Sequence, residues 1–377
     1  MRRRNPPLGS ISCPGHLSRD YKRSPNAYKA LFLDSSDPLC RWVIVSFSLH
    51  SILLGCMDCN MWRFLLVMML TAATVASAQT LSPPSGWPQF TYKGVVTDKD
   101  TLKYNPTNEF IFPSVLHAGQ HLDNPLGEWY LYYAPHENPG GISLLYADDL
   151  NGPWTEYAKN PIIKNQTPNY SVPHVSSPDA AWNFETKSIF LYFHGDNTET
   201  RWAQDISGQG TAFKYGGVAV NNAMVSTQAT ETSYARVFKH PDQDSSYRYG
   251  MFFMSNEKDN RRKIRMAESA DGKTWDVASG YTVYPGAEEG QNVSGPDLWN
   301  WNGKRYIIYH GSSGNCYART IDKTLRKVGE TPILLYKPTV GGRAAAPQIK
   351  TVGSHSYLFF ESGDRLGATI AWAETGN

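Results

Sequence analysis

HVSSPDAAWNFETKSIFLYFHGDN, residues His174–Asn197, decides the fold of this chain, because the chain repeats it. The copy, NVSGPDLWNWNGKRYIIYHGSSG, spans Asn292–Gly314. Both read Pro-Asp, then Trp-Asn, then a short apolar run that ends in His-Gly. Self-similarity over tens of residues is typical of a structural unit that the fold uses more than once.

Three weaker copies align with these two and make five units in all. Each begins with a short strand, continues into an aromatic-rich second strand and then into a third strand. The five first strands are FPSVLHAG from Phe112, SSPDAAWN from Ser176, SYARVFKH from Ser233, SGPDLWNW from Ser294 and AAPQIKTV from Ala345. Short strands separated by NG, DG and GG turns, with no long helical pattern, indicate four-stranded blades. The sequence therefore predicts an all-β, five-bladed β-propeller. The alternative, a β-sandwich of two similar sheets, does not explain five copies.

The ends of the repeat predict how the ring closes. The fifth unit stops at Asn377 after its third strand, and PQFTYKGVVT from Pro88 alternates like a strand but has no unit of its own. We expect this N-terminal strand to supply the outer strand of the fifth blade and to close the ring, because closure removes exposed sheet edges. The propeller domain is predicted to span residues 79–377.

The first 78 residues have a different character. MWRFLLVMMLTAATVASAQT, from Met61, has a basic start, an apolar stretch and Ala76-Ser77-Ala78, and it is typical of a secretory signal peptide over residues 61–78. Residues 1–60 lack a domain-like pattern, and we interpret them as an upstream extension that precedes the true start at Met61. The alternative is a membrane anchor that begins at Trp42–Cys56 and runs on towards Ala73, although Asp58 and Arg63 interrupt it.

Charge and cysteine content change once this segment is set aside. Residues 1–78 hold 9 of the 36 Lys and Arg and 4 of the 34 Asp and Glu, so the remainder carries a formal charge of −3 instead of +2. No basic surface is left to suggest a nucleic-acid partner. Only Cys316 remains of the five cysteines, so we expect no internal disulfide. Three sequons, at Asn165, Asn169 and Asn292, are candidate glycan sites. We predict a secreted, extracellular monomer that no longer contacts a membrane after signal cleavage.

The blade geometry predicts where a site lies. The first strand of a blade lines the central channel and the second strand returns beside it, so the start of the first and the end of the second share one face. Strand-two ends bring His136, His194, Asp196, His310 and Glu361 to this face, and strand-one starts bring Glu109, His174, Glu231 and Arg343. Asp179, Arg236, Asp297 and Gln348 lie one residue past the Pro position of their units, which Ala235 occupies in the third.

Each of these residues also has a structural interpretation. A His at the end of an apolar strand is commonly a hydrogen-bonded structural residue, and an Asp after Pro can cap the adjoining turn. Three histidines at one blade position, with carboxylates around them, favour contact with a ligand. We assign Asp179, His194, Asp297, His310 and Glu361 as candidate catalytic residues. The candidate substrate-binding residues are Glu109, His136, His174, Asp196, Glu231, Arg236, Arg343 and Gln348.

These phrases resemble a known family. LLYADDLNGPWTEYAKNPII, from Leu144, is similar to the outer hairpin of the family 43 glycoside hydrolases, the arabinanases and xylosidases, and SGPDLWNWNGKRYIIYH is similar to their blade phrase. The resemblance covers residues 88–377 and implies a carbohydrate-active protein with one site at the mouth of the channel. In that family two carboxyl groups flank the scissile glycosidic bond.

The chain departs from the family at both catalytic positions. The family has Asp-Pro in the first blade and Glu-Gly-Pro in a later one, whereas this chain has Phe112-Pro113 and Ser294-Gly295-Pro296. The family's acids are therefore not carried over: other acids act, or His does, or the protein is not a hydrolase. Imidazole can exchange protons at mildly acidic pH. Relatives hold Ca²⁺ in the channel or an ion on histidines, but no HExxH, CxxC or EF-hand spacing occurs here, so we predict no metal ligands and no certain cofactor.

Three functions follow from these features. The first is an exo-acting glycoside hydrolase on the side chains of plant or microbial polysaccharides. The second is a polysaccharide lyase, with Arg236 or Arg343 holding a uronate carboxylate. The third is a non-catalytic sugar-binding propeller, which the unequal residues at the five face positions disfavour. All three take an oligo- or polysaccharide as partner.

Overall fold

The computed structural model describes residues 80–376. The predicted extension over residues 1–60 and the predicted signal peptide over 61–78 lie outside the described residues. Within residues 80–376, no helix has the length and apolarity needed to cross a membrane.

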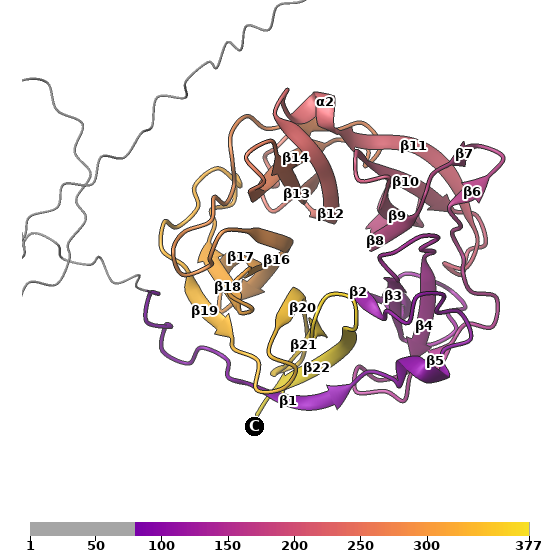
Figure 1. Cartoon of the computed structure of the whole chain (residues 1–377), viewed down its shortest axis with the longest axis horizontal. Coiled ribbons are helices and arrows are strands. Elements are labelled where there is room, and N and C mark those ends of the chain that lie inside the picture. Colours follow the sequence, from indigo (N-terminus) through magenta and orange to yellow (C-terminus); the bar gives the residue numbers. More distant parts are fainter. Residues whose placement is uncertain (1–79, 377) are drawn as a thin grey trace, which may run out of the picture. The chain divides into compact units, whose positions relative to one another are not determined.

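Five four-stranded antiparallel sheets surround a central axis (Figure 1), and we number them in chain order. Sheet one holds β2 (Ile111–His117), β3 (Trp129–Ala134), β4 (Ser143–Ala147) and β5 (Thr155–Glu156). Sheet two holds β8 (Val175–Asn183), β9 (Ser188–Gly195), β10 (Glu199–Asp205) and β11 (Phe213–Asn221). Sheet three holds β12 (Ala229–Lys239), β13 (Tyr249–Glu257), β14 (Arg262–Ser269) and β15 (Asp276–Val277). Sheet four holds β16 (Val293–Trp301), β17 (Lys304–Gly311), β18 (Cys316–Thr320) and β19 (Ile333–Tyr336). Sheet five holds β20 (Ala344–Val352), β21 (His355–Ser362), β22 (Thr369–Thr375) and β1 (Phe90–Val95).

The predicted five-bladed propeller is confirmed, with the repeated phrases forming the first and second strands of the sheets. The first strands β2, β8, β12, β16 and β20 lie nearest the centre in Figure 1. In sheet five, β1 pairs antiparallel with β22, from Phe90 opposite Thr375 to Val95 opposite Ala371. That sheet therefore combines the first and the last of the described strands.

The remaining elements are short. They are the hairpin of β6 (Gln166–Thr167) and β7 (Tyr170–Ser171), the 3-10 turns η1 (Lys99–Thr101) and η2 (Ala118–Gln120), and the helix α2 (Asn222–Val225). Asn221 caps α2 by accepting a hydrogen bond from the backbone N–H of Met224. The absence of a long helical pattern in the sequence agrees with these short elements.

The core is divided among the interfaces between sheets. Five clusters of buried apolar side chains lie at the interfaces between neighbouring sheets. The cluster between sheet five and sheet one includes Phe359 and Leu131. The aromatic second strands contribute most of this packing, since every residue of β3 is buried. Sequestering these large side chains from water is the main favourable term that holds the ring together.

All five first strands carry the same backbone irregularity. In each one, the pairing register with the second strand skips two residues at the Pro position of the repeat. The residue just before that position has a positive φ in every sheet: Phe112, Ser177, Tyr234, Gly295 and Ala346. Left-handed backbone is costly for residues other than glycine, so five equivalent bulges indicate a feature that the surrounding structure enforces.

Candidate active site

The start of each first strand and the end of each second strand meet at one edge of the propeller, which we call the strand-start edge. The opposite edge carries the turns between first and second strands, and we call it the hairpin edge. Nine of the sequence-predicted residues lie at or beside the strand-start edge: Glu109, His136, His174, His194, Asp196, Glu231, His310, Arg343 and Glu361. The other four lie past the bulges, on the channel wall.

A row of histidines runs along the strand-start edge from sheet one to sheet two. Arg365 contacts the Nε2 of His136, whose ring centroid lies 5.8 Å from that of His174. The Nε2 atoms of His174 and His194 are 3.2 Å apart, and the Nδ1 of His194 lies 2.7 Å from the Oγ of Ser177. Burial, and then the nearby His174, lower the pKa of His194 well below its ordinary value. His194 is therefore neutral near pH 7 and can accept a proton.

A buried carboxylate lies at the same edge in sheet five. The Oε1 of Glu361 accepts a hydrogen bond of 3.3 Å from the backbone N–H of Phe112, and its Oε2 accepts one of 3.2 Å from Arg343. Both donors stabilise the ionised carboxylate. The side chain of Glu361 is only 2% exposed, whereas that of Arg343 is 25% exposed. In this ion pair the guanidinium of Arg343 is therefore more exposed to solvent than the carboxylate of Glu361.

Tyr234 lies between these two groups, and sequence reasoning missed it. Its ring contacts that of Phe112 at 4.9 Å and approaches that of His310 at 6.3 Å, measured between centroids. Burial, and then the charge of Glu361, raise the pKa of the Tyr234 phenol, while three guanidinium groups act in the opposite direction: those of Arg343, Arg262 and Arg365. The Tyr234 hydroxyl forms no hydrogen bond within residues 80–376, so it is available to a ligand. Tyr234 precedes Ala235, which occupies the Pro position of its unit, just as Ser177 and Gly295 precede the Pro of theirs. This equivalence could have identified Tyr234 from the sequence.

Two further glutamates hold the edge in shape. The Oε2 of Glu109 accepts hydrogen bonds of 3.0 Å from the backbone N–H groups of His136 and Glu137, while its buried Oε1 has no partner among the described residues. The Oε1 of Glu231 accepts one of 2.8 Å from Ser233, and its Oε2 lies 3.8 Å from Arg262. Glu231 is therefore less tightly held than Glu361.

His310 and Asp196 have mainly local contacts. The Nδ1 of His310 accepts a hydrogen bond of 3.1 Å from the backbone N–H of Ala346 at the bulge of sheet five. Burial, followed by the charges of Arg343 and Arg262, lowers the pKa of His310 well below its ordinary value. Asp196 is exposed and accepts hydrogen bonds from the N–H and hydroxyl of Thr198. His310 thus fixes a bulge, and Asp196 fixes a turn.

The residues one past the Pro position form a second layer on the channel wall: Ser114, Asp179, Arg236, Asp297 and Gln348. Arg236 is buried and donates to the carbonyls of Pro178 at 2.8 Å and Pro113 at 2.7 Å. Sheets one and three are not neighbours, so Arg236 reaches across the channel. Asp179 accepts from Ser114 at 3.2 Å and from the backbone of Val237 at 2.7 Å, and it lies 3.6 Å from Arg236.

Gln348 and Asp297, the remaining two members of this layer, differ in their surroundings. The Oε1 of Gln348 accepts a short hydrogen bond from the backbone N–H of Val115, which ties sheet five to sheet one. Asp297 is half-buried, and burial raises its pKa to about 6, against the opposing charges of Lys350 and Arg236. Asp179, Arg236, Asp297 and Gln348 are therefore not brought together with the histidine row. The Phe112–Tyr234 contact, which also spans the channel, lies at the bulges one step nearer the strand-start edge.

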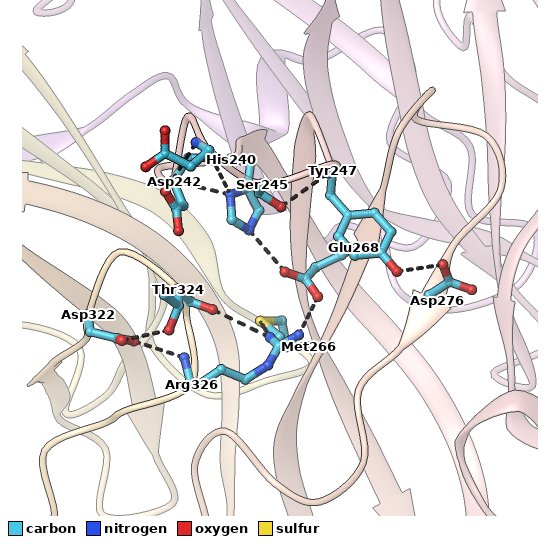
Figure 2. Close-up of polar contacts among 11 residues, drawn as sticks. His240, Asp242, Ser245, Tyr247, Met266, Glu268, Asp276, Asp322, Thr324 and Arg326 are labelled. Atoms are coloured by element: carbon cyan, nitrogen blue, oxygen red, sulfur yellow. Dashed lines mark hydrogen bonds and ion pairs between the residues drawn. The ribbon is translucent and has the colours of Figure 1, made fainter.

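A separate polar cluster lies at the hairpin edge, where Figure 2 shows Glu268 between His240 and Arg326. His240 Nε2 is 3.0 Å from one Glu268 oxygen, and Arg326 contacts the other. This cluster links sheet three to the segment after β18. No group of three or more His, Cys, Asp or Glu side chains within residues 80–376 could hold a metal ion.

Comparisons with known proteins bear on the fold. No family model and no curated protein matches the sequence. Among solved structures, an α-L-arabinofuranosidase from Lactobacillus brevis is similar, with 15% identity, TM-score 0.53, and coverage of 72% of this chain and 93% of that one. The chain has the fold of the five-bladed glycoside hydrolases.

Two further neighbours agree. A Podospora anserina α-L-arabinofuranosidase solved with cellotriose has 10% identity and TM-score 0.53, with coverage of 77% and 98%. A thermostable family-43 glycoside hydrolase has 14% identity and TM-score 0.53, with coverage of 71% and 90%. At such identities the likeness establishes architecture, and the chemistry has to be argued from this chain's own residues.

Proposed function

We propose that this protein is a secreted, exo-acting glycoside hydrolase that removes sugars from the side chains of plant or microbial polysaccharides. The observation that carries the proposal is the convergence of Glu361, Tyr234 and the histidine row at one end of the channel, in a fold shared with glycoside hydrolases. Secretion is supported by the signal-like segment from Met61.

Phe112 and Tyr234 come from non-adjacent sheets, and their ring centroids lie 4.9 Å apart across the channel. A substrate therefore approaches the site from the strand-start edge. Exo-action, in which that substrate presents a chain end or a side branch, is part of our proposal and is tested by the products that the enzyme releases.

The chemistry needs an ionised carboxylate and a proton donor on either side of the glycosidic bond. In our proposal Glu361, whose oxygens accept hydrogen bonds from the Phe112 backbone and from Arg343, is the carboxylate that assists attack on the anomeric carbon. Glu231, which is less constrained, protonates the leaving oxygen. His174 binds sugar hydroxyls as a neutral imidazole. His194, whose two ring nitrogens contact His174 and Ser177, holds His174 in place. Asp179 and Asp297 act as positioning residues in the channel wall, because they balance the charges of Arg236 and Lys350 below the bulges.

The test is a screen of aryl glycosides and neutral oligosaccharides with wild type, Glu361→Gln and Glu231→Gln. We expect release of one terminal sugar and a fall of about 10²–10⁴-fold in kcat for each variant, the usual contribution of an acid–base group. Asp244→Asn, at an exposed position of the hairpin edge, is the matched control and should keep full activity. Failure to release any sugar across the panel would argue against the hydrolase.

One observation favours a second candidate, a polysaccharide lyase. The charges of Arg343, Arg262 and Arg365 act on the Tyr234 phenol and oppose the rise of its pKa, and an arginine can hold the carboxylate of a uronate while a neutral base removes the adjacent proton. Arg343 and His194 would take these roles. Elimination forms an unsaturated uronate with a strong ultraviolet absorbance. No rise in absorbance on any uronate polymer would remove this candidate.

A further inference from the structure

A cavity of about 680 Å³ lies at the hairpin edge between sheets four and five, away from the strand-start edge. The turn after β16, the turn after β20 and the segment leading into β1 form its walls. Its lining side chains are amides, hydroxyls and two tryptophans, Trp87 and Trp301, and no charged residue is among them. A cavity without charges is unusual on a protein surface and excludes ions as the preferred ligand.

The aromatic floor of this cavity is rigid. The rings of Trp87 and Trp301 lie 5.1 Å apart in an edge-to-face arrangement, and Trp299 supports both. Trp87 is 6% exposed, whereas Trp301 is partly exposed and offers ring surface to the cavity.

The polar wall of the cavity has unused hydrogen-bonding capacity. The side chains of Asn300 and Asn302 form no hydrogen bonds within the described residues, and each amide offers two donors and one carbonyl acceptor. Asn302 has a φ of 47° in the tight turn between β16 and β17, and both Asn300 and Asn302 are exposed. Exposed amides beside an indole ring suit a ligand that has both apolar faces and hydroxyl groups.

We propose that this cavity is a second, non-catalytic binding site for a neutral oligosaccharide. The C–H face of a sugar ring packs on Trp301, as apolar surfaces do on aromatic rings, while its hydroxyls exchange hydrogen bonds with Asn300, Asn302 and the neighbouring hydroxyl groups. The inference does not depend on the reaction at the strand-start edge. Because the two sites lie at opposite edges, one polysaccharide matrix can occupy both, and binding at the second raises the effective substrate concentration at the first.

The test is isothermal titration calorimetry with cellotriose, xylotriose and β-1,3-galactotriose, and with trigalacturonate as the anionic probe. The titrated protein carries Glu361→Gln, so that the reaction proposed at the strand-start edge does not consume the probe. We expect one neutral trisaccharide to bind, and Trp301→Ala to weaken it about tenfold or more, because a stacked face is lost. Since Trp301 supports Trp87, the second variant is Asn302→Asp, which keeps the turn and adds a charge.

In the Glu361→Gln protein, Asn302→Asp should weaken neutral binding to a similar degree. In protein with an intact Glu361, the same substitution should leave the hydrolysis of small aryl glycosides unchanged. Asp244→Asn should change neither binding nor hydrolysis. Absence of binding by all three neutral probes would overturn the proposal. So would affinity that is unchanged in both cavity variants, or trigalacturonate binding more tightly at this cavity than the neutral probes. Failure of aryl glycoside hydrolysis, with neutral binding retained, would instead contradict only the function proposed for the strand-start edge.

Discussion

At the scale of single residues, the Tyr234 hydroxyl gives the most direct test of the strand-start edge. Tyr234→Phe keeps the ring that contacts Phe112 and His310 and removes only a hydroxyl without a protein partner. We expect the urea unfolding midpoint to stay unchanged and kcat/KM to fall about 10–100-fold, as for a lost hydrogen bond to a charged or reacting group. Equal activity of the variant would place the substrate elsewhere.

The raised pKa of Asp297 predicts how the stability of the protein depends on pH. Its folded-state pKa is about 6, above the ordinary 3.8, so the folded protein binds the extra proton between these values. Stability from this group is therefore highest below about pH 4 and falls as the pH rises through 6, because the folded state then carries a poorly solvated charge. Asn does not titrate. We expect the melting temperature of Asp297→Asn, relative to wild type, to be higher at pH 7 than at pH 4. The same difference at both pH values would contradict the shift.

At the scale of structural elements, Arg236 holds the bulges of three first strands together. It donates to the carbonyls of Pro113 and Pro178 and balances Asp179, and all of these groups are buried. Arg236→Ala leaves the carbonyls without a donor and the Asp179 charge uncompensated. Breaking a buried charged pair typically costs 3–5 kcal/mol, so we expect a loss of about that size in urea unfolding. Arg305→Ala is the control, because Arg305 is only partly buried and its side chain forms no hydrogen bond within the described residues. An equally small effect of both substitutions would show that Arg236 is dispensable.

The bulges also explain how far the sequence could predict the site. The alternation of apolar and polar residues and the repeated Pro-Asp phrase were enough to predict five sheets and the edge of the propeller at which His194 and Glu361 both lie. They could not separate Ser177 from Asp179, two residues apart, because a bulge with positive φ sends one towards His194 and the other to Arg236. A positive φ at Phe112 or Tyr234 has no sequence signal, since neither residue favours it. Arg262 is the first residue of β14, and Arg365 lies in the connection between β21 and β22. Both were missed because the sequence analysis considered only the starts of first strands and the ends of second strands.

At the scale of the whole molecule, the ring is held by contacts between sheets as well as within them. Glu268 joins His240 to Arg326 across such a boundary (Figure 2). The side chains of Glu268 and His240 are only 7% and 2% exposed. Replacing Glu268 by Ala removes the carboxylate that both partners contact, and we expect a loss of about 1–3 kcal/mol in urea unfolding without a change in activity. Equal stability of wild type and Glu268→Ala would mean that the cluster is incidental.

Deleting the N-terminal strand tests whether the propeller depends on the pairing of β1 with β22, which is distant in sequence. Residues 80–96 contribute β1, which covers the edge of β22, and Trp87, which packs on Trp299 and Trp301. Their deletion exposes the N–H and C=O groups of β22 and removes a buried tryptophan. Exposed edges pair with other chains, so we expect the shortened protein to self-associate in size-exclusion chromatography and to unfold at lower urea. Loss of the packing of one buried tryptophan typically lowers the free energy of unfolding by about 3–5 kcal/mol.

A peptide of residues 80–97, added in trans, separates these effects from general misfolding. If β22 keeps its geometry, the peptide should pair with it as an added strand and restore the monomer. A peptide with Gly94 replaced by Pro is the control, since Pro removes a backbone donor at the irregularity between Tyr92 and Gly94. Rescue by the first peptide and weaker rescue by the second would establish that β1 closes the propeller. A shortened protein that stays monomeric, with an unchanged unfolding midpoint, would show that sheet five is complete with three strands.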